Sequence, residues 1–156
     1  MLSIDTNILF VAANPGSEHH STARSLLGNW SKRKDVVISE LVLAEFYGLL
    51  RNPKVSINPI AAPEAVNMVQ AYRRHPIWKI VGFPLEGQKC HDAIWNKAAE
   101  PGMAFRRFYD LRLALSLIAQ GVDEFATINV RDFKNLDFRR VWNPLSKADD
   151  AALQEI

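Results

Sequence analysis

An aspartate interrupts an apolar segment at the very start of the sequence. The chain opens with MLSIDTNILF, in which Asp5 has apolar residues close by on both sides. An unpaired carboxylate that is buried costs several kcal/mol of stability. Asp5 is therefore expected either to emerge at the end of a strand or to meet a positively charged partner. Divalent cations such as Mg²⁺ are typical partners of carboxylate oxygens.

A second acid, Glu45, lies on the apolar face of a predicted helix. In ELVLAEFYGLLR (residues 40–51) each residue turns by about 100° from the one before, and the apolar side chains fill one broad arc. Glu45 falls inside this arc, between Leu41 and Leu49, whereas Glu40 falls outside it. We therefore expect Glu40 in solvent, and Glu45 is the anomalous acid.

Asp110 repeats the anomaly in another predicted helix, FYDLRLALSLIAQG. Apolar residues surround Asp110 over an arc of about 200°, while Arg112, Ser116 and Gln120 lie opposite. Arg112, the strongest local counter-charge, therefore points away from Asp110. Two helices each place one carboxylate on the face that is expected to pack on a sheet.

Each acid also has a purely structural explanation. Asp5 could be a turn residue, Asp110 could interact with the helix dipole, and Asp132 could cap a short helix. Together, several carboxylates at one point would repel one another unless a cation joined them. Oxygen ligands without cysteine suit Mg²⁺ or Mn²⁺, ions that support phosphodiester hydrolysis.

The elements that must position these acids alternate between strand-like and helix-like segments. The expected strands are 2–5, 35–39, 77–83, 124–129 and 138–144. The expected helices begin at Ile8, at Ser17 (as N-cap, running to about Lys32), at Glu40 (stopped by Pro53), and near Glu64, Glu86 and Phe108. This order predicts an α/β fold with right-handed βαβ units and a central parallel sheet of about four to five strands flanked by helices.

Several polar residues are expected at one edge of this sheet. In such folds the functional crevice lies outside the carboxyl ends of the strands. Asp5 ends the first predicted strand, Asn129 ends the fourth, and Asp132 lies just beyond it. Thr6 and Asn7 follow Asp5 into the same edge, where they can donate hydrogen bonds to its carboxylate.

The composition is typical of one globular domain. The chain has 156 residues, of which 48% are hydrophobic and 23% charged, and its net charge of +2 gives no strong polyanion-binding signal. The single cysteine, Cys90, excludes an internal disulfide and a cysteine-rich zinc site. No apolar run approaches the roughly 20 residues that cross a bilayer, and no signal peptide is evident, so we expect a cytoplasmic protein without membrane contact.

Tryptophans and basic residues outside the acidic set have simple explanations. Trp30, Trp78, Trp95 and Trp142 are expected in the core or in a dimer interface, not as platforms on which bases stack. The basic residues that flank the acidic edge in sequence could contact phosphates, although solvation alone accounts for any one of them. They are Arg106, Arg107, Arg131, Lys134, Arg139 and Arg140.

With these residues laid out, the chain resembles the PIN-domain ribonucleases, and within them the VapC-type toxins of toxin–antitoxin pairs. The matching stretches are DTNIL, ISELVLAEFYGLLRNP, YDLRLALSLIAQGV and ATINVRDF, which occur in the family's order and span nearly the whole chain. The resemblance implies a PIN domain over residues 1–145, followed by a polar C-terminal tail over 146–156.

The resemblance also implies roles for individual residues. The first three catalytic and metal-binding acids of the family fall on Asp5, Glu45 and Asp110. The fourth falls either on Asn129 or on Asp132, and Asp132 is favoured because Asn129 carries no charge. Thr127 matches a hydroxyl residue of the same strand, so the supporting residues are Thr6, Asn7, Thr127 and Asn129.

What the resemblance implies for function is an Mg²⁺- or Mn²⁺-dependent endoribonuclease toxin that acts on RNA. It also implies a homodimer that is inhibited by a small VapB-like antitoxin encoded beside it. The alternative is a catalytically inactive PIN-like domain that binds RNA or protein. A phosphatase of the haloacid dehalogenase type is disfavoured, because it needs a second Asp where this chain has Asn7.

Overall fold

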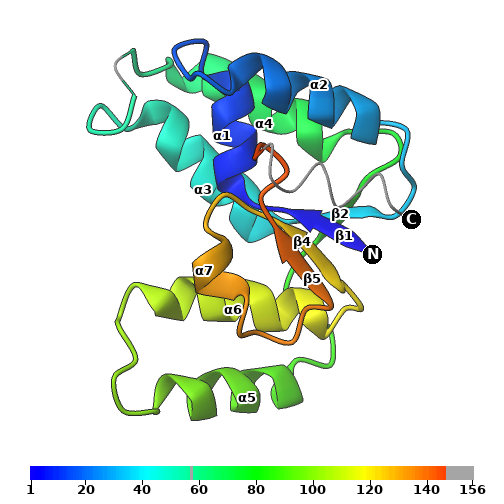
Figure 1. Cartoon of the computed structure of the whole chain (residues 1–156), viewed down its shortest axis with the longest axis vertical. Coiled ribbons are helices and arrows are strands. Elements are labelled where there is room, and N and C mark those ends of the chain that lie inside the picture. The colour runs from blue at the N-terminus through cyan, green and yellow to red at the C-terminus, as the bar shows by residue number, and fades with distance from the viewer. Residues whose placement is uncertain (57, 147–156) are drawn as a thin grey trace.

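A five-stranded parallel sheet lies between two layers of helices in the computed structural model, which describes residues 1–56 and 58–146 (Figure 1). The strand order is β3-β2-β1-β4-β5, and every neighbouring pair is parallel. The strands are β1 (Leu2–Ile4), β2 (Val36–Ser39), β3 (Lys79–Val81), β4 (Glu124–Ala126) and β5 (Arg140–Trp142). The predicted α/β fold with a parallel sheet is confirmed.

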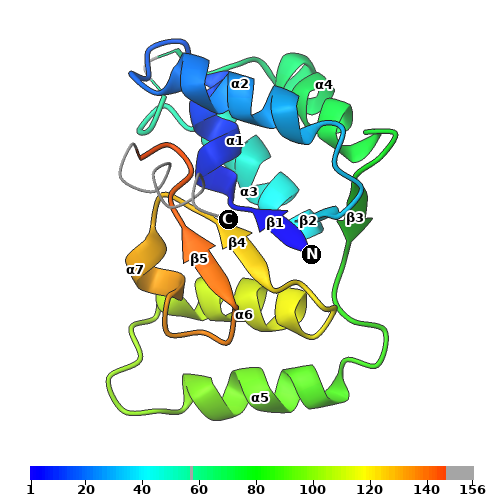
Figure 2. The ribbon, with the colours of Figure 1, turned by 45° about the vertical axis from the view of Figure 1, so that its right-hand side comes forward.

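The helices divide between the two faces of the sheet. They are α1 (Thr6–Ala13), α2 (His20–Trp30), α3 (Glu40–Arg51), α4 (Ala62–Arg73), α5 (Gln88–Ala98), α6 (Arg107–Ile118) and α7 (Val130–Phe133). Figures 1 and 2 show α1 to α4 on one face and α5 and α6 on the other. The chain builds outward from β1 to β3 on one side and then returns to add β4 and β5 on the other. Such a reversal opens a crevice at the carboxyl ends of the central strands.

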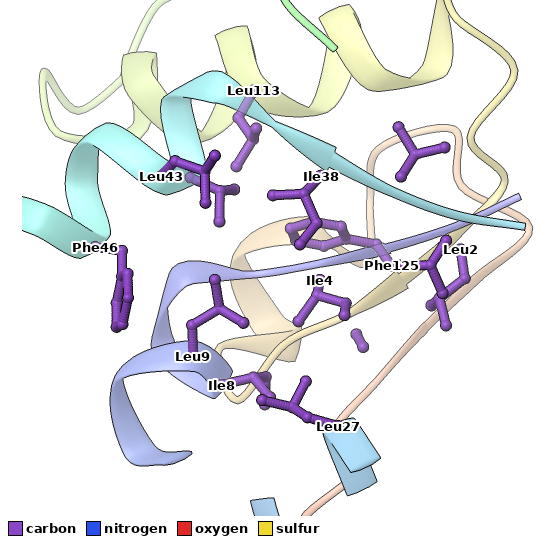
Figure 3. Close-up of a cluster of buried hydrophobic side chains, with 14 of the residues drawn as sticks. Leu2, Ile4, Ile8, Leu9, Leu27, Ile38, Leu43, Phe46, Leu113 and Phe125 are labelled. Carbon is purple, nitrogen blue, oxygen red and sulfur yellow. The ribbon is translucent and has the colours of Figure 1, made fainter. Parts of the chain in front are cut away.

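The central strands are buried on both faces. Every residue of β1 and β2 is buried, as expected for parallel strands that helices cover on both sides. Figure 3 shows Ile4 of β1 beside Leu9 of α1, and both belong to the buried cluster that also contains Phe125 of β4 and Leu113 of α6. This packing holds the carboxyl end of β1 in a fixed place, and Asp5 follows it directly.

Two predicted boundaries were wrong for a local reason. Ser17 is not an N-cap: α2 begins three residues later, and the Ser17 hydroxyl accepts the backbone N–H of His19 in a turn before the helix. The fourth strand ends at Ala126, because the Thr127 hydroxyl accepts the backbone N–H of Asn129 and turns the chain away from the sheet.

The remaining segments fit the prediction more closely. Helix α3 ends at Arg51, just before Pro53, and a fifth strand is present at the predicted place. No helix in the described part of the chain has the length and apolar character needed to span a membrane. Of the predicted tail, residues 147–156 lie outside the described residues.

Candidate active site

Asp5 joins the central strand to the first helix. It follows β1 in extended conformation and is the N-cap of α1, where its carboxylate accepts the backbone N–H of Thr6 at 2.7 Å. Such a cap satisfies one of the backbone donors that a helix start leaves free. The residue is only 7% exposed, so its carboxylate is fixed at the inner end of the crevice.

Two further donors surround the same carboxylate. The Nδ2 of Asn7 donates to Asp5 Oδ2 at 2.7 Å, and the hydroxyl of Thr127 donates to that oxygen as well. Asn7 is itself held, because its Oδ1 accepts the backbone N–H of Ile128. The prediction that Thr6 and Asn7 hydrogen-bond to Asp5 is confirmed, Thr6 through its backbone. These bonds tie the ends of β1 and β4 together around one carboxylate.

Glu45 reaches the same place from the middle of α3. The helix begins with Ser39 as N-cap, whose hydroxyl accepts the backbone N–H of Leu41. Leu41, Glu45 and Leu49 line one pocket of about 490 Å³, so Glu45 lies between the two leucines as predicted. The expectation that Glu45 faces the sheet was wrong, because its side chain is exposed at the pocket and the buried face of α3 lies farther round the helix. The hydroxyl of Thr6 donates to Glu45 Oε2 at 2.7 Å. One residue, Thr6, therefore contacts both acids, Asp5 through its backbone and Glu45 through its side chain.

Asp110 lies in the first turn of α6 and lines the same pocket, half-buried. Arg112 lines this pocket too, with its guanidinium over the ring of Phe83 at 5.3 Å, and among the described residues it forms no ion pair with Asp110. Ser116, which the helical period places opposite Asp110, is only 2% exposed, and its hydroxyl donates to the backbone carbonyl of Leu113. Helix α6 lies between the sheet and α5 (Figure 2).

The structure separates the two candidates for the fourth position. Asn129 lines the pocket of Asp5, Glu45 and Asp110. Asp132 lies in α7 and lines a neighbouring hollow, which shares only Asp110 with that pocket and also contains Arg107. Asp110 therefore stands between the two hollows.

The pKa values of Asp5 and Asp110 are both raised, first by burial and then by neighbouring negative charges. The pKa of Asp5 rises from 3.8 to about 6, chiefly through burial and also through the charges of Glu45 and Asp110, although hydrogen bonds from Thr127 and Thr6 act to lower it. The pKa of Asp110 is also raised, first by burial and then by the charges of Asp132 and Glu45. A cation among these carboxylates would relieve the repulsion.

The donor set fits a magnesium-type ion bound mainly through water. Within residues 1–56 and 58–146, no three His, Cys, Asp or Glu side chains stand arranged as a ready metal cage. Mg²⁺ does not require one, because it usually keeps several waters and binds through one or two carboxylates together with substrate phosphates. Asp5, Glu45 and Asp110 supply only oxygen, and in the described part of the chain no basic side chain is paired with them.

The rim of the pocket contains residues that the sequence pattern alone does not separate from other residues near the acids. Arg106 and Tyr109 line it beside Asp110, whereas Arg139 pairs with Asp123 and Glu124 around the start of β4. Proximity in sequence to the acids therefore predicts the position of Arg106 at the pocket, but it fails for Arg139. Tyr109 directly precedes Asp110, and this adjacency is the signal that could have identified it.

The comparison with known proteins agrees with the fold and the residue pattern. No family model matches the sequence. Ribonuclease VapC24 of Mycobacterium tuberculosis, in strains H37Rv and CDC 1551 / Oshkosh, is 45% identical over 146 residues, which cover 94% of this chain and 98% of the relative.

Solved structures give the same answer for the fold. VapBC2 from Rickettsia felis, bound to a DNA fragment from its promoter, aligns with a TM-score of 0.64 at 21% identity, covering 91% of this chain and 97% of that one. VapC20 of M. tuberculosis, a Sarcin-Ricin loop cleaving toxin, aligns with a TM-score of 0.59 at 19% identity, covering 80% and 87%. FitAB bound to an IR36 DNA fragment aligns with a TM-score of 0.62 at 18% identity, covering 94% and 96%. The sequence identity to VapC24, over nearly the full length of both chains, shows the family: this chain belongs to the VapC ribonucleases, the PIN-domain toxins of toxin–antitoxin systems.

Proposed function

We propose that Asp5, Glu45 and Asp110 bind Mg²⁺ or Mn²⁺ and that RNA is cut by hydrolysis in the pocket they line. The observation that carries this proposal is their convergence: three carboxylates from three separate elements line one pocket. Among the described residues none of them has a basic partner. When bound, the cation supplies positive charge that offsets their repulsion and stabilises negative charge on the phosphodiester.

The side chains around the acids orient them for this task. Thr127 and Asn7 hold the Asp5 carboxylate by hydrogen bonds, and Thr6 holds that of Glu45. Held in this way, the carboxylates need little rearrangement when the cation and the RNA arrive. Asn129 is placed to contact the same ligands directly, whereas Asp132 acts on Asp110 through its charge.

The active enzyme is favoured over an inactive PIN-like domain that only binds RNA or protein. The pKa values of Asp5 and Asp110 are raised first by burial and also by the negative charges of neighbouring acids, and a bound cation would offset both effects. A binding module gains nothing from this repulsion, whereas a nuclease needs the charge to attract its metal.

We infer three further properties of the protein in the cell. An antitoxin of the VapB type restrains it, as the structural neighbours VapBC2 and FitAB are toxin–antitoxin complexes. The toxin forms a homodimer, as the family resemblance implies. Its RNA substrate places its action in the cytoplasm, and single-stranded segments of structured RNA are the expected targets.

Cleavage of RNA is expected to depend on the cation. Purified protein should cut single-stranded RNA in the presence of Mg²⁺ or Mn²⁺, and cleavage should stop when a chelator is added. Without the cation, the carboxylates repel one another and the RNA phosphate. Gel analysis of end-labelled RNA gives the rate. Cutting that persists in chelator, after removal of contaminating nucleases, would overturn the metal-dependent mechanism.

Expression without a partner is expected to slow growth of the host cell. Co-expression with the small gene beside this one should restore growth, because the antitoxin covers the acidic pocket. Growth curves and sequencing of the new RNA ends measure the effect and identify the cut site. Normal growth with folded wild-type protein present would argue against the toxin role.

A further inference from the structure

Three large aromatic side chains are exposed on and before α6 and on α5, and one of them, Tyr109, lines the acidic pocket. Tyr109 is 72% exposed, Phe105 is 79% exposed, and Trp95 is 59% exposed. We call these three residues the aromatic rim. Trp95 does not lie in the core, the first of the two places expected for the tryptophans, whereas Trp78 and Trp142 are buried.

The aromatic rim extends directly from the pocket. Tyr109 lines the pocket that contains Asp5 and Asp110. Its ring meets that of Phe108 edge-on at 5.9 Å, and Phe108 lies 4.9 Å from Trp95 on α5. Figures 1 and 2 show α5 running along the outer side of α6. The aromatic surface thus leads from the acids across α6 to α5.

Positive charge accompanies these rings. Arg106 lines the same pocket as Tyr109, and its guanidinium lies 5.6 Å from the centre of the Phe105 ring. Arg107, the first residue of α6, is exposed next to it. Proteins that hold single-stranded nucleic acid combine such basic groups, which contact phosphates, with aromatic rings on which bases stack.

We propose that the aromatic rim, with Arg106, holds the bases of single-stranded RNA on one side of the cut. This inference rests on the proposed cleavage site and adds a binding surface to it. A strand whose phosphodiester lies at the acids meets Tyr109 in the same pocket, and the Phe108 ring links Tyr109 to Trp95. Every base has a flat aromatic face, so the aromatic rim can bind RNA of many sequences. Its position then determines the side from which the RNA strand enters the pocket.

RNA fits this surface better than a second protein does. Tyr109 belongs to the pocket proposed to cut the substrate, and Arg106 in the same pocket, with the exposed Arg107 next to it, supplies the positive charge that phosphates require.

The test compares binding of two RNAs by two variants. In chelator, where cutting is blocked, the affinity for a fluorescein-labelled single-stranded RNA is measured by anisotropy, next to the same RNA with abasic sites. Tyr109→Ala is expected to weaken binding of the complete RNA about tenfold, in line with the energy of one base–aromatic stack. Tyr109→Phe keeps the ring and should bind within about twofold of wild type. The two variants should bind the abasic RNA with equal affinity.

Controls separate the alternatives. Leu85→Ala removes a fully exposed apolar side chain away from the pocket and should change nothing. If Tyr109→Ala binds the complete RNA as tightly as wild type, or if it loses the abasic RNA equally, the proposal is overturned. It is also overturned if sedimentation shows that Tyr109→Ala no longer forms a dimer and that its affinity for RNA falls only where the dimer is lost. Cleavage by wild type in Mg²⁺ is measured in parallel, so a failure of the catalytic site is recognised separately.

Discussion

Replacing Glu45 by glutamine is expected to reduce RNA cleavage by about a hundredfold or more. The change keeps the size of the side chain and one oxygen, so the hydrogen bond from Thr6 survives. What it removes is a negative charge in the pocket of Asp5 and Asp110, and with it part of the attraction for the cation. Single-turnover cleavage of a labelled RNA measures the loss, and the affinity for Mn²⁺ should fall with it.

Glu40→Gln is the matched control on the same helix. Glu40 is exposed at the start of α3 and lines a different hollow, near Tyr47 and Gly82. Its removal is expected to leave cleavage within about twofold of wild type, because its distance from the pocket and the surrounding water screen its charge. Equal losses in the two variants would show that the helix does not direct Glu45 alone into the site.

This pair of acids illustrates what the sequence allowed us to predict. Helix α3 has a strong apolar period, a serine N-cap and a proline after its end, so its position and its phase both follow from local chemistry. The phase alone places Glu45 between Leu41 and Leu49, and the structure confirms this placement. The parallel sheet follows equally well from the alternation of strand-like and helix-like segments.

Other features depend on contacts that no local pattern reports. Ser116 is buried although the helical period of α6 places it opposite the acid Asp110, because helix α6 packs on more than one side. The choice between Asn129 and Asp132 depends on a turn that the Thr127 hydroxyl makes after β4. Arg139 is close to the acids in sequence, yet it pairs with Asp123 near the opposite end of β4.

Replacing Asp5 by asparagine is expected to abolish cleavage while leaving the metal-free protein equally stable or more stable at neutral pH. The raised pKa of about 6, against 3.8 in the unfolded chain, means that the ionised carboxylate destabilises the fold by about 3 kcal/mol above pH 6. Asparagine removes this charge and keeps the cap on Thr6. Opposing this gain, the amide nitrogen of asparagine replaces the Oδ2 that accepts from both Asn7 and Thr127, so these two hydrogen bonds are lost, at about 1 kcal/mol each.

The stability difference between Asp5→Asn and wild type is expected to change with pH in a defined direction. Because the folded pKa of Asp5 lies above the unfolded one, wild type gains stability as the pH falls through about 6, and the gain is complete below about 4. The variant has no such group, so its advantage over wild type should shrink by about 1 kcal/mol by pH 5. Thermal melting in chelator at several pH values measures the difference.

Asp123→Asn supplies a control of opposite sign. Hydrogen bonds from the N-terminal amine and from Arg139 lower the pKa of Asp123 to about 2, so this acid stabilises the fold at neutral pH and loses its effect only as the pH falls towards 2. Its replacement should lower the melting temperature and leave cleavage unchanged. If Asp5→Asn behaved like Asp123→Asn in melting, Asp5 would be an ordinary structural acid, and a cation would no longer be needed to explain a carboxylate buried at the end of the central strand.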